Sequence, residues 1–379
     1  MPILHPIFIF IFLFLAIASY WEIFKLEKKQ SIFVWIAGIA VVIAVGFRID
    51  VGADYPVYRI LFSGFAMYTT YGDVFDKAIF KSNAEEIEWF FVFINKLIFD
   101  VGLPFHYVTL VMAIITVSLK FSTIYKNVAF PTLALMFYFM PIMFFEDSGQ
   151  MRQGIGIAIC VFSFKYIKSQ NLWMFLLCMY IALGFHKTSV VFFPAYWLVR
   201  IPLNSTRIFW ILIISLLLSP LQLYRFGGSL VESVIPQDIS GAYTGYLNDR
   251  YFGTEVETGL NDIIKLIFIY ILIRHDKKTC EEVWWYEYMR NLAVFGLALF
   301  YVMRSNEIFA VRLPGAYMFF LTMFCMPSIV YALKDGARRT LYFGFMSYFF
   351  IMFFYFGKGN GDRGSFTTGR YKNALWKDL

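Results

Sequence analysis

Long apolar stretches separated by short polar turns are the dominant pattern of this chain. A helix needs about 20 mostly apolar residues to cross the hydrocarbon core of a bilayer, which is roughly 30 Å thick. The stretches that meet or approach this length cover residues 3–21, 31–47, 105–119, 128–145, 150–167, 171–185, 187–200, 207–223, 259–273, 290–304, 313–333 and 340–356. The pattern therefore predicts an all-α polytopic membrane protein with about 12 transmembrane helices.

A shorter apolar stretch at residues 88–99 carries Asn95 and Lys96 in its middle. These polar side chains favour an interfacial or re-entrant helix over a membrane span. When this stretch stays on one side of the membrane, basic residues fall in alternate turns, near Lys25, Lys120, Lys165, Arg200, Arg274 and Lys334. Because Lys and Arg concentrate in cytoplasmic loops, we place these turns in the cytoplasm and both termini outside.

The longer polar segments then fall on the outer face. We interpret residues 1–356 as a single transmembrane domain with outer-face segments at 48–104 and 224–258. Residues 357–379 are rich in glycine, so we expect them to form a flexible external tail.

Composition and charge narrow the possible classes of function. Hydrophobic residues make up 60% of the chain and charged residues only 16%, as in a membrane protein. The formal charge of +7 follows from the basic cytoplasmic turns and requires no nucleic-acid partner. The chain has no Walker-type Gly-Lys-Ser/Thr loop, no His-Glu-x-x-His and no Asp-x-Asp, and its four cysteines are scattered. We therefore expect no cofactor and no metal site.

Polar residues at the outer ends of the predicted spans form one set that comes from four helix junctions. The set comprises Arg48, Asp50, Asp54, Glu146, Asp147, Arg152, Gln153, His186, Lys187, Arg304, Glu307 and Arg312. Charged side chains are costly at a membrane boundary, so their expected use is to contact a substrate or a partner.

Arg152 and Gln153 begin the predicted span at 150–167. A guanidinium beside the free amide groups of a helix N-terminus suits an anion such as a diphosphate. The alternative is that Arg152 simply pairs with Glu146 or Asp147.

His186 and Lys187 lie at the junction between two predicted spans. The ordinary pKa of histidine, near 6.5, makes His186 a candidate proton acceptor. A helix cap or an interface residue is the alternative interpretation.

Asp54 lies in a Gly- and Pro-containing turn just beyond the second predicted span. It is either a proton acceptor for a hydroxyl group or the N-cap of a helix that starts near Pro56. Tyr55 and Tyr58 follow it and offer flat faces for sugar rings.

These elements together resemble a known family. The segment Gly52–Tyr58, the pair Arg152–Gln153, the segment Phe185–Ser189 and Arg312 just before a late span follow the order seen in the EpsG family. That family contains Wzy-type bacterial polysaccharide polymerases, which make O-antigens and exopolysaccharides. The stretch Glu85–Phe90 also resembles a Glu-containing stretch that follows the Asp-Tyr motif in the family.

The resemblance implies a metal-independent glycosyltransferase of GT-C-like architecture in the bacterial inner membrane, with its active site facing the periplasm or exterior. The implied substrates are oligosaccharide repeat units carried on undecaprenyl diphosphate. Membrane lipids are further expected partners, and a chain-length regulator protein is a candidate partner.

The resemblance also suggests roles for single residues. Arg152 and Arg312, with Arg48 or Arg370 as further candidates, would stabilise the departing diphosphate. Asp54 or His186 would accept the proton of the acceptor hydroxyl. We expect substrate contacts from Arg48, Tyr55, Tyr58, Arg59, Gln153, Lys187, Arg304, Arg312 and Arg370.

Two other classes of protein stay open at this point. A lipid-linked oligosaccharide flippase or transporter predicts internal repeats and polar residues near the midplane in both halves, whereas we place only Lys265 clearly within a span. A membrane-bound glycan acyltransferase would place a histidine at a depth similar to that of His186.

Overall fold

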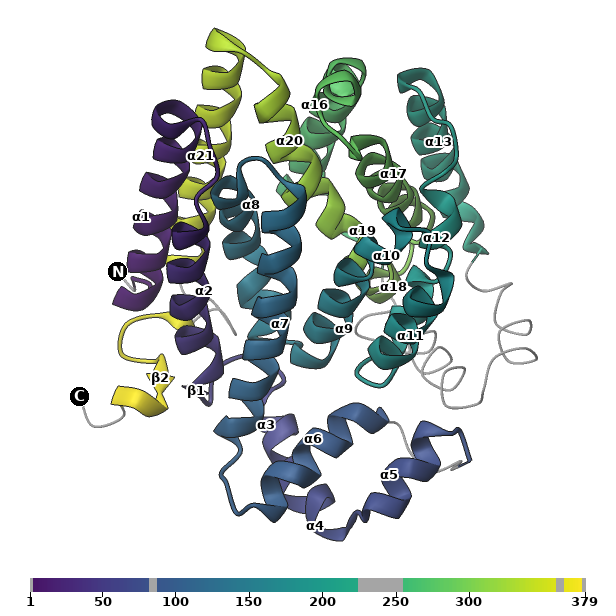
Figure 1. Ribbon diagram of the computed structural model, residues 1–379. Coiled ribbons are helices and arrows are strands. Elements are labelled where there is room, and N and C mark those ends of the chain that lie inside the picture. Colours follow the sequence, from purple (N-terminus) through teal and green to yellow (C-terminus); the bar gives the residue numbers. More distant parts are fainter. Residues whose placement is uncertain (1–2, 82–86, 224–254, 359–364, 377–379) are drawn as a thin grey trace.

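The computed structural model describes residues 3–81, 87–223, 255–358 and 365–376. Its long elements are helices, most of which run side by side in one bundle (Figure 1). The bundle helices are α1 (Pro6–Trp21), α2 (Ser31–Gly46), α7 (His106–Asn127), α8 (Pro131–Phe137), α9 (Met151–Phe162), α10 (Phe164–Lys168), α11 (Leu172–Leu183), α12 (Ala195–Leu198), α13 (Ser205–Leu218), α16 (Leu260–Glu282), α17 (Tyr286–Val302), α18 (Glu307–Arg312), α19 (Gly315–Phe319), α20 (Met326–Ala332) and α21 (Asp335–Gly357). Irregular helical segments connect several of them, including η3 (Tyr138–Asp147), η4 (Lys187–Phe192) and η6 (Phe320–Cys325).

Length and composition identify the helices that are able to cross a membrane. Among the described residues, four segments qualify, namely Pro6–Leu26, His106–Asn127, Gly315–Ala332 and Asp335–Gly357. Shorter apolar helices cover Ser31–Gly46, Leu172–Leu183 and Ser205–Leu221. The protein is thus an all-α membrane protein, as predicted. The number of about 12 spans and the GT-C-like architecture stay predictions.

One predicted boundary is wrong for a physical reason. Lys120 was expected in a cytoplasmic turn, but α7 continues past it to Asn127. The ammonium of Lys120 is buried and lies 2.8 Å from Asp147 Oδ1 and 3.3 Å from Glu146 Oε2. Because two carboxylates compensate its charge, Lys120 sits inside the helix without ending it. Lys120 is therefore a second charge inside an apolar helix, besides Lys265.

A layer of short helices lies across one end of the bundle (Figure 1). It contains α3 (Tyr55–Ile60), α4 (Ala66–Tyr68), α5 (Tyr71–Ala78) and α6 (Trp89–Asp100). We call it the end layer. Helix α6 corresponds to the apolar stretch predicted at 88–99, and it lies across the end of α7 rather than alongside it, as an interfacial helix would. Most of the other predicted outer-face segment, 224–258, lies outside the described residues.

The last described segment packs against the beginning of the chain. Strand β2 (Lys372–Asn373) pairs antiparallel with β1 (Arg48–Ile49), and Leu4 forms a bridge with Thr367. The expectation of a flexible tail is therefore wrong for residues 365–376. Hydrogen bonds from this segment go to the backbone carbonyls of Ile43, Ala44 and Phe47 at the end of α2.

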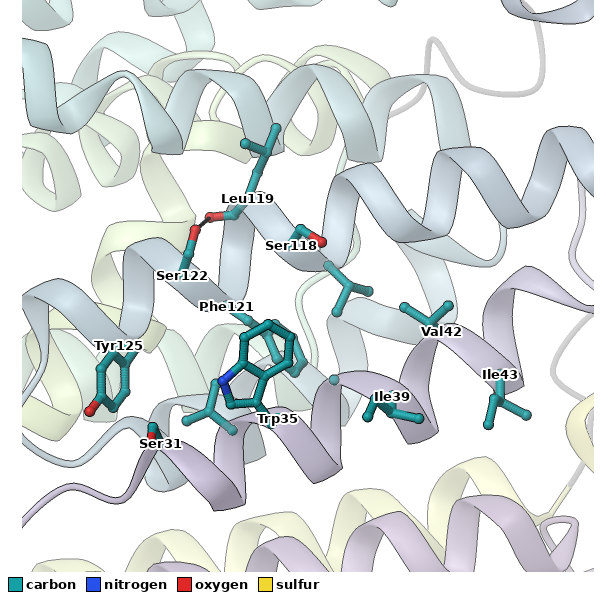
Figure 2. A pocket seen from close by; sticks show the side chains of 13 residues that line it. Ser31, Trp35, Ile39, Val42, Ile43, Ser118, Leu119, Phe121, Ser122 and Tyr125 are labelled. Atoms are coloured by element: carbon teal, nitrogen blue, oxygen red, sulfur yellow. Dashed lines mark hydrogen bonds between the residues drawn. The ribbon is translucent and has the colours of Figure 1, made fainter.

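A groove with a volume of 530 Å³ runs between α2 and α7 (Figure 2). It is mostly apolar, and two of the side chains that line it, Trp35 and Ile39, are 70% and 58% exposed. An apolar groove of this kind on the bundle surface suits contact with hydrocarbon chains.

Candidate functional site

Helix α9 presents Arg152 at its N-terminus, next to the end layer. Arg152 Nη1 donates a 2.7 Å hydrogen bond to Glu88 Oε2. The guanidinium carbon lies 5.4 Å from the ring centre of Tyr58 and 5.6 Å from that of Phe91. Arg152 Nε and Gln153 Oε1 are buried, and neither has a hydrogen-bond partner within the protein. An unpartnered buried polar atom calls for an explanation, and an acceptor oxygen of a ligand would provide one for Arg152 Nε.

Glycines explain how α9 comes so close to its neighbours. A Cβ at Gly154 would lie 2.5 Å from Asp147 Oδ1, and a Cβ at Gly156 would lie 2.6 Å from Ser189 Oγ. Only glycine allows both contacts without displacement, so this pair holds the N-terminal half of α9 against η3 and η4.

Glu88 is fixed by the docking of α6 on the end of α11. The backbone amides of Phe90 and Phe91 donate to the carbonyl oxygen of Gly184, at 2.7 and 3.2 Å. Glu88 is buried, and its second oxygen accepts a 3.2 Å hydrogen bond from the backbone amide of Lys187. Glu88 thus connects the end layer to α9 and to the start of η4.

Sequence reasoning did not include Glu88 among the site residues. The available signal was the Glu-containing stretch at 85–90, which resembled the family but offered three glutamates without a way to choose among them. Two of the three, Glu85 and Glu86, lie outside the described residues.

His186 caps the first turn of η4 and is neutral at ordinary pH. Its Nδ1 accepts a hydrogen bond from the backbone amide of Thr188 at 3.4 Å and lies 2.7 Å from Thr188 Oγ1. Since a backbone amide can only donate, the ring proton belongs on Nε2. Enclosure by the protein lowers the pKa of His186 to about 4; Glu88 opposes this shift, while Arg152 and Arg312 add to it.

Asp54 is connected to Arg152 through Tyr58. It directly precedes α3, as the N-cap interpretation expected, but its side chain makes no capping hydrogen bond. Instead, Asp54 Oδ2 accepts a 3.3 Å hydrogen bond from the hydroxyl of Tyr58. Burial raises the pKa of Tyr58 to about 12, so this hydroxyl stays protonated and remains a donor.

Gln153 joins the end of α18 to the site. Its Nε2 donates to the backbone carbonyl of Arg312 at 3.2 Å. Arg312 is half-buried, and its charge acts on His186. The structure therefore brings together Asp54, Tyr58, Glu88, Arg152, Gln153, His186, Lys187 and Arg312, which we call the Arg152 cluster.

Arg48 lies outside the Arg152 cluster and is bonded mainly to backbone carbonyls. It is 1% exposed, its Nε donates to the carbonyl of Val51 at 3.2 Å, and one terminal nitrogen donates to the carbonyl of Val45. The other terminal nitrogen lies 3.8 Å from Met151 Sδ. These contacts stabilise the end of α2 and leave Arg48 little reach toward a substrate.

Four other candidate residues, namely Arg59, Arg304, Tyr55 and Arg370, contact residues outside the Arg152 cluster. Arg59 forms an exposed ion pair with Asp50 at 2.8 Å, and Arg304 forms a two-pronged ion pair with Asp262 at 2.7 and 2.8 Å. The Tyr55 ring is buried against Phe105, with 5.1 Å between ring centres, so it does not present a flat face to a sugar. Arg370 is exposed in the turn before β2.

The alternative pairing proposed for Arg152 is wrong. Glu146 and Asp147 pair with Lys120, and Asp147 also accepts a 2.6 Å hydrogen bond from the hydroxyl of Tyr138. Arg152 pairs with Glu88. The Arg152–Glu88 pair and the group of Lys120 with Glu146 and Asp147 are therefore separate, whereas the sequence suggested one set.

The Arg152 cluster is equipped to hold an anion next to a sugar. Arg152, Lys187 and Arg312 supply positive charge, Glu88 and Asp54 supply carboxylates, and His186 supplies a neutral N–H donor. The helix bundle and this cluster define a membrane-embedded protein with a polar site at one end.

The EpsG family matches residues 31–372, which is nearly the whole chain. The chain belongs to this bacterial family of Wzy-like polysaccharide polymerases, so the expected resemblance is confirmed. No curated protein and no solved structure matches the chain.

Proposed function

We propose that this polymerase joins oligosaccharide repeat units carried on undecaprenyl diphosphate, by glycosyl transfer at the outer leaflet of the bacterial inner membrane. The observation that carries the proposal is the Arg152 cluster, in which a half-buried arginine has a buried, unpartnered Nε beside a neutral histidine. Family membership supports polysaccharide polymerisation in general, and the chemistry of the cluster supports a diphosphate-bearing donor.

The diphosphate of the donor would bind Arg152, with Lys187 and Arg312 nearby. In the resting structure Glu88 neutralises Arg152, so a bound phosphate would compete with Glu88 for the guanidinium. A diphosphate offers several acceptor oxygens and more charge than one carboxylate. Binding would therefore release Glu88 from its partner.

Glycosyl transfer then follows. The oxygen of the acceptor hydroxyl attacks the anomeric carbon of the donor, the bond from that carbon to the diphosphate oxygen breaks, and undecaprenyl diphosphate leaves. Arg152 and Arg312 would stabilise the negative charge on the leaving group, and His186 Nε2–H would donate a hydrogen bond to it.

The contacts favour Glu88 as the base over Asp54 and His186. When the diphosphate takes over the Arg152 guanidinium, Glu88 Oε2 is released beside the site and becomes available to accept a proton. Asp54 already accepts the Tyr58 hydroxyl, and protonation of His186 at Nδ1 would break its contact with the Thr188 amide. Glu88 would take the hydroxyl proton, while Asp54 would hold Tyr58 against Arg152.

The hydrocarbon chain of the donor needs an apolar path along the bundle. The groove between α2 and α7 (Figure 2) is a candidate for such contacts, because its lining is apolar and partly exposed.

The test is an assay in which purified protein in vesicles receives a radiolabelled lipid-linked repeat unit. Wild-type protein should give a ladder of chain lengths. Glu88→Gln should lose roughly a hundredfold or more of the rate, as expected for a general base. Asp76→Asn is the matched control because it alters an exposed carboxylate of α5 in the same end layer.

Two results would contradict the proposal. Acyl transfer to a chain of unchanged length would identify an acyltransferase. Movement of the lipid-linked unit across the vesicle membrane without joining would identify a flippase.

A further inference from the structure

A second polar pocket lies at the other end of α7 from the end layer. Its volume is 450 Å³, and Lys126 and Asn127 at the C-terminus of α7 line it. The turn between α1 and α2 contributes Lys28 and Lys29, and the end of α10 contributes Lys168. Since α7 has 22 residues, its two ends are about 33 Å apart, and the pocket lies at the end away from the end layer.

The pocket carries uncompensated positive charge. Four lysines and two glutamates, Glu27 and Glu282, line it. Within the described part of the chain, none of the four ammonium groups lies within the 4.0 Å of a carboxylate that defines an ion pair. The pocket is therefore complementary to an anion.

Neutral groups hold two of these lysines in place. Lys29 Nζ donates to the carbonyl of Tyr125 at 2.8 Å and lies 4.8 Å from the centre of that ring. Lys168 Nζ donates to Asn127 Oδ1 and lies 5.9 Å from the ring of Trp285. Such contacts orient the ammonium groups without neutralising them.

An unpartnered hydroxyl lies in the wall of the pocket. Ser328 lines the pocket and is 1% exposed, yet its Oγ has no hydrogen-bond partner. A buried hydroxyl without a partner is costly, and the Ser328 hydroxyl would have to turn toward the pocket to donate to a phosphate oxygen.

We propose that this pocket binds the phosphate headgroup of an anionic glycerophospholipid from the surrounding bilayer. Trp284, Trp285 and Tyr331 line the same pocket, and Trp284 is 81% exposed. Tryptophan and tyrosine concentrate at the membrane interface, where a lipid headgroup lies. Basic pockets between helices on the cytoplasmic side suit such headgroups, and the positive-inside rule places these lysines on that side.

This site is distinct from the one used in the proposed function. It lies at the opposite end of α7, and it needs neither a sugar nor a diphosphate. Failure of the polymerisation assay would leave this inference intact, and failure of the lipid experiment would leave the polymerase proposal intact.

The test measures lipid binding to the purified full-length protein by native mass spectrometry. The probes are phosphatidylglycerol, zwitterionic phosphatidylcholine and inorganic phosphate. Phosphatidylglycerol should bind in preference to phosphatidylcholine, and inorganic phosphate should not displace it. The double variant Lys28→Gln/Lys126→Gln should weaken phosphatidylglycerol binding by roughly thirtyfold.

The matched control is Lys25→Gln/Lys278→Gln, which removes the same charge from two exposed lysines that do not line the pocket. It should retain the preference for phosphatidylglycerol. Equal binding of the two lipids, an equal loss in both double variants, or displacement by inorganic phosphate would overturn the proposal. The comparison requires that all variants are folded. Equal melting temperatures without added lipid would show this.

Discussion

Arg152 and its neighbour Gln153 connect α9 to three other parts of the molecule. The Arg152 guanidinium bonds to Glu88 and faces Tyr58, and Gln153 bonds to the backbone of Arg312. Without Glu88 this half-buried guanidinium would lose its carboxylate partner, which is unfavourable. Glu88 therefore both stabilises the resting structure and occupies the place that a phosphate would take.

Replacement of Arg152 by alanine should reduce the rate of polymerisation by roughly a hundredfold to a thousandfold, as for loss of one oxyanion-hole donor. Arg152→Lys should recover only part of this loss, because an ammonium cannot form the two parallel hydrogen bonds of a guanidinium. The measurement is chain length and rate with the purified variants. Arg59→Ala, which removes only an exposed ion pair, should lose less than tenfold. Equal loss in Arg59→Ala and Arg152→Ala would contradict the assignment.

The lowered pKa of His186 sets the expected pH dependence. Its ring is neutral at pH values above about 4, so protonation of His186 should reduce activity only near pH 4. The unfolded chain binds this proton near pH 6.5, so stability should fall as the pH decreases from 6.5 toward 4. His186→Gln should remove that part of the decrease. A decline in activity between pH 6 and 7 that disappears in His186→Gln would show instead that His186 is the base.

The sequence predicted most residues of the Arg152 cluster, but not the contacts between them. Arg152, Gln153, His186, Lys187 and Arg312 were expected at neighbouring helix ends, and the structure brings them together. Glu88 was missed and the Asp262 partner of Arg304 was not foreseen, because partner choice depends on contacts between residues far apart in the chain. Arg304 meets Asp262, which lies 42 residues earlier, and no local pattern reveals that contact.

Helix α2 ends in a set of carbonyls that other elements satisfy. Asn373 Nδ2 donates to Ile43 O at 2.9 Å, the Tyr371 hydroxyl donates to Ala44 O at 2.6 Å, and the Ala374 amide donates to Phe47 O at 2.7 Å. The C-terminal segment thus acts as a cap for a helix more than 300 residues away in the chain. It also fixes the start of the chain, since the Phe366 carbonyl accepts a hydrogen bond from the backbone amide of His5.

Tyr371→Phe should therefore destabilise the protein, even though it lies outside the Arg152 cluster. The change leaves the Ala44 carbonyl without its buried donor, at a cost of about 1 to 3 kcal/mol. The measurement is the melting temperature of purified protein in detergent, which should fall by a few degrees. Tyr68→Phe is the control, because Tyr68 is 80% exposed. An unchanged melting temperature in Tyr371→Phe would show that the tail does not cap α2.

Helices were easier to predict than the contacts between them. The apolar stretches at 31–47 and 171–185 became α2 and α11 almost without change, because composition alone determines such segments. The extension of α7 beyond residue 119 and the ordering of residues 365–376 were missed. Both depend on tertiary partners, namely Asp147 for Lys120 and the end of α2 for Tyr371.

At the scale of the whole molecule, the structure collects distant segments at one end of the bundle. Strand β1, strand β2 and the end layer all lie there (Figure 1). The predicted topology placed these same segments on one side of the membrane. The lysine-rich pocket lies at the far end of α7, on the side predicted to be cytoplasmic.

This arrangement makes a prediction about membrane topology. A single cysteine at position 370, introduced after replacement of the four native cysteines, should react with a membrane-impermeant thiol reagent in intact cells. A single cysteine at position 278 should react only after the membrane is disrupted, because it lies in the basic last turns of α16, which are expected in the cytoplasm. The opposite labelling pattern would invert the topology and move the Arg152 cluster to the cytoplasmic side.

The most direct test of the central claim is a density map of the full-length protein with bound undecaprenyl diphosphate. We predict phosphate density within hydrogen-bond distance of the Arg152 guanidinium and of His186 Nε2, with Glu88 displaced from Arg152. Phosphate density beside the Arg304–Asp262 pair or in the lysine-rich pocket, with the Arg152–Glu88 ion pair intact, would contradict the account.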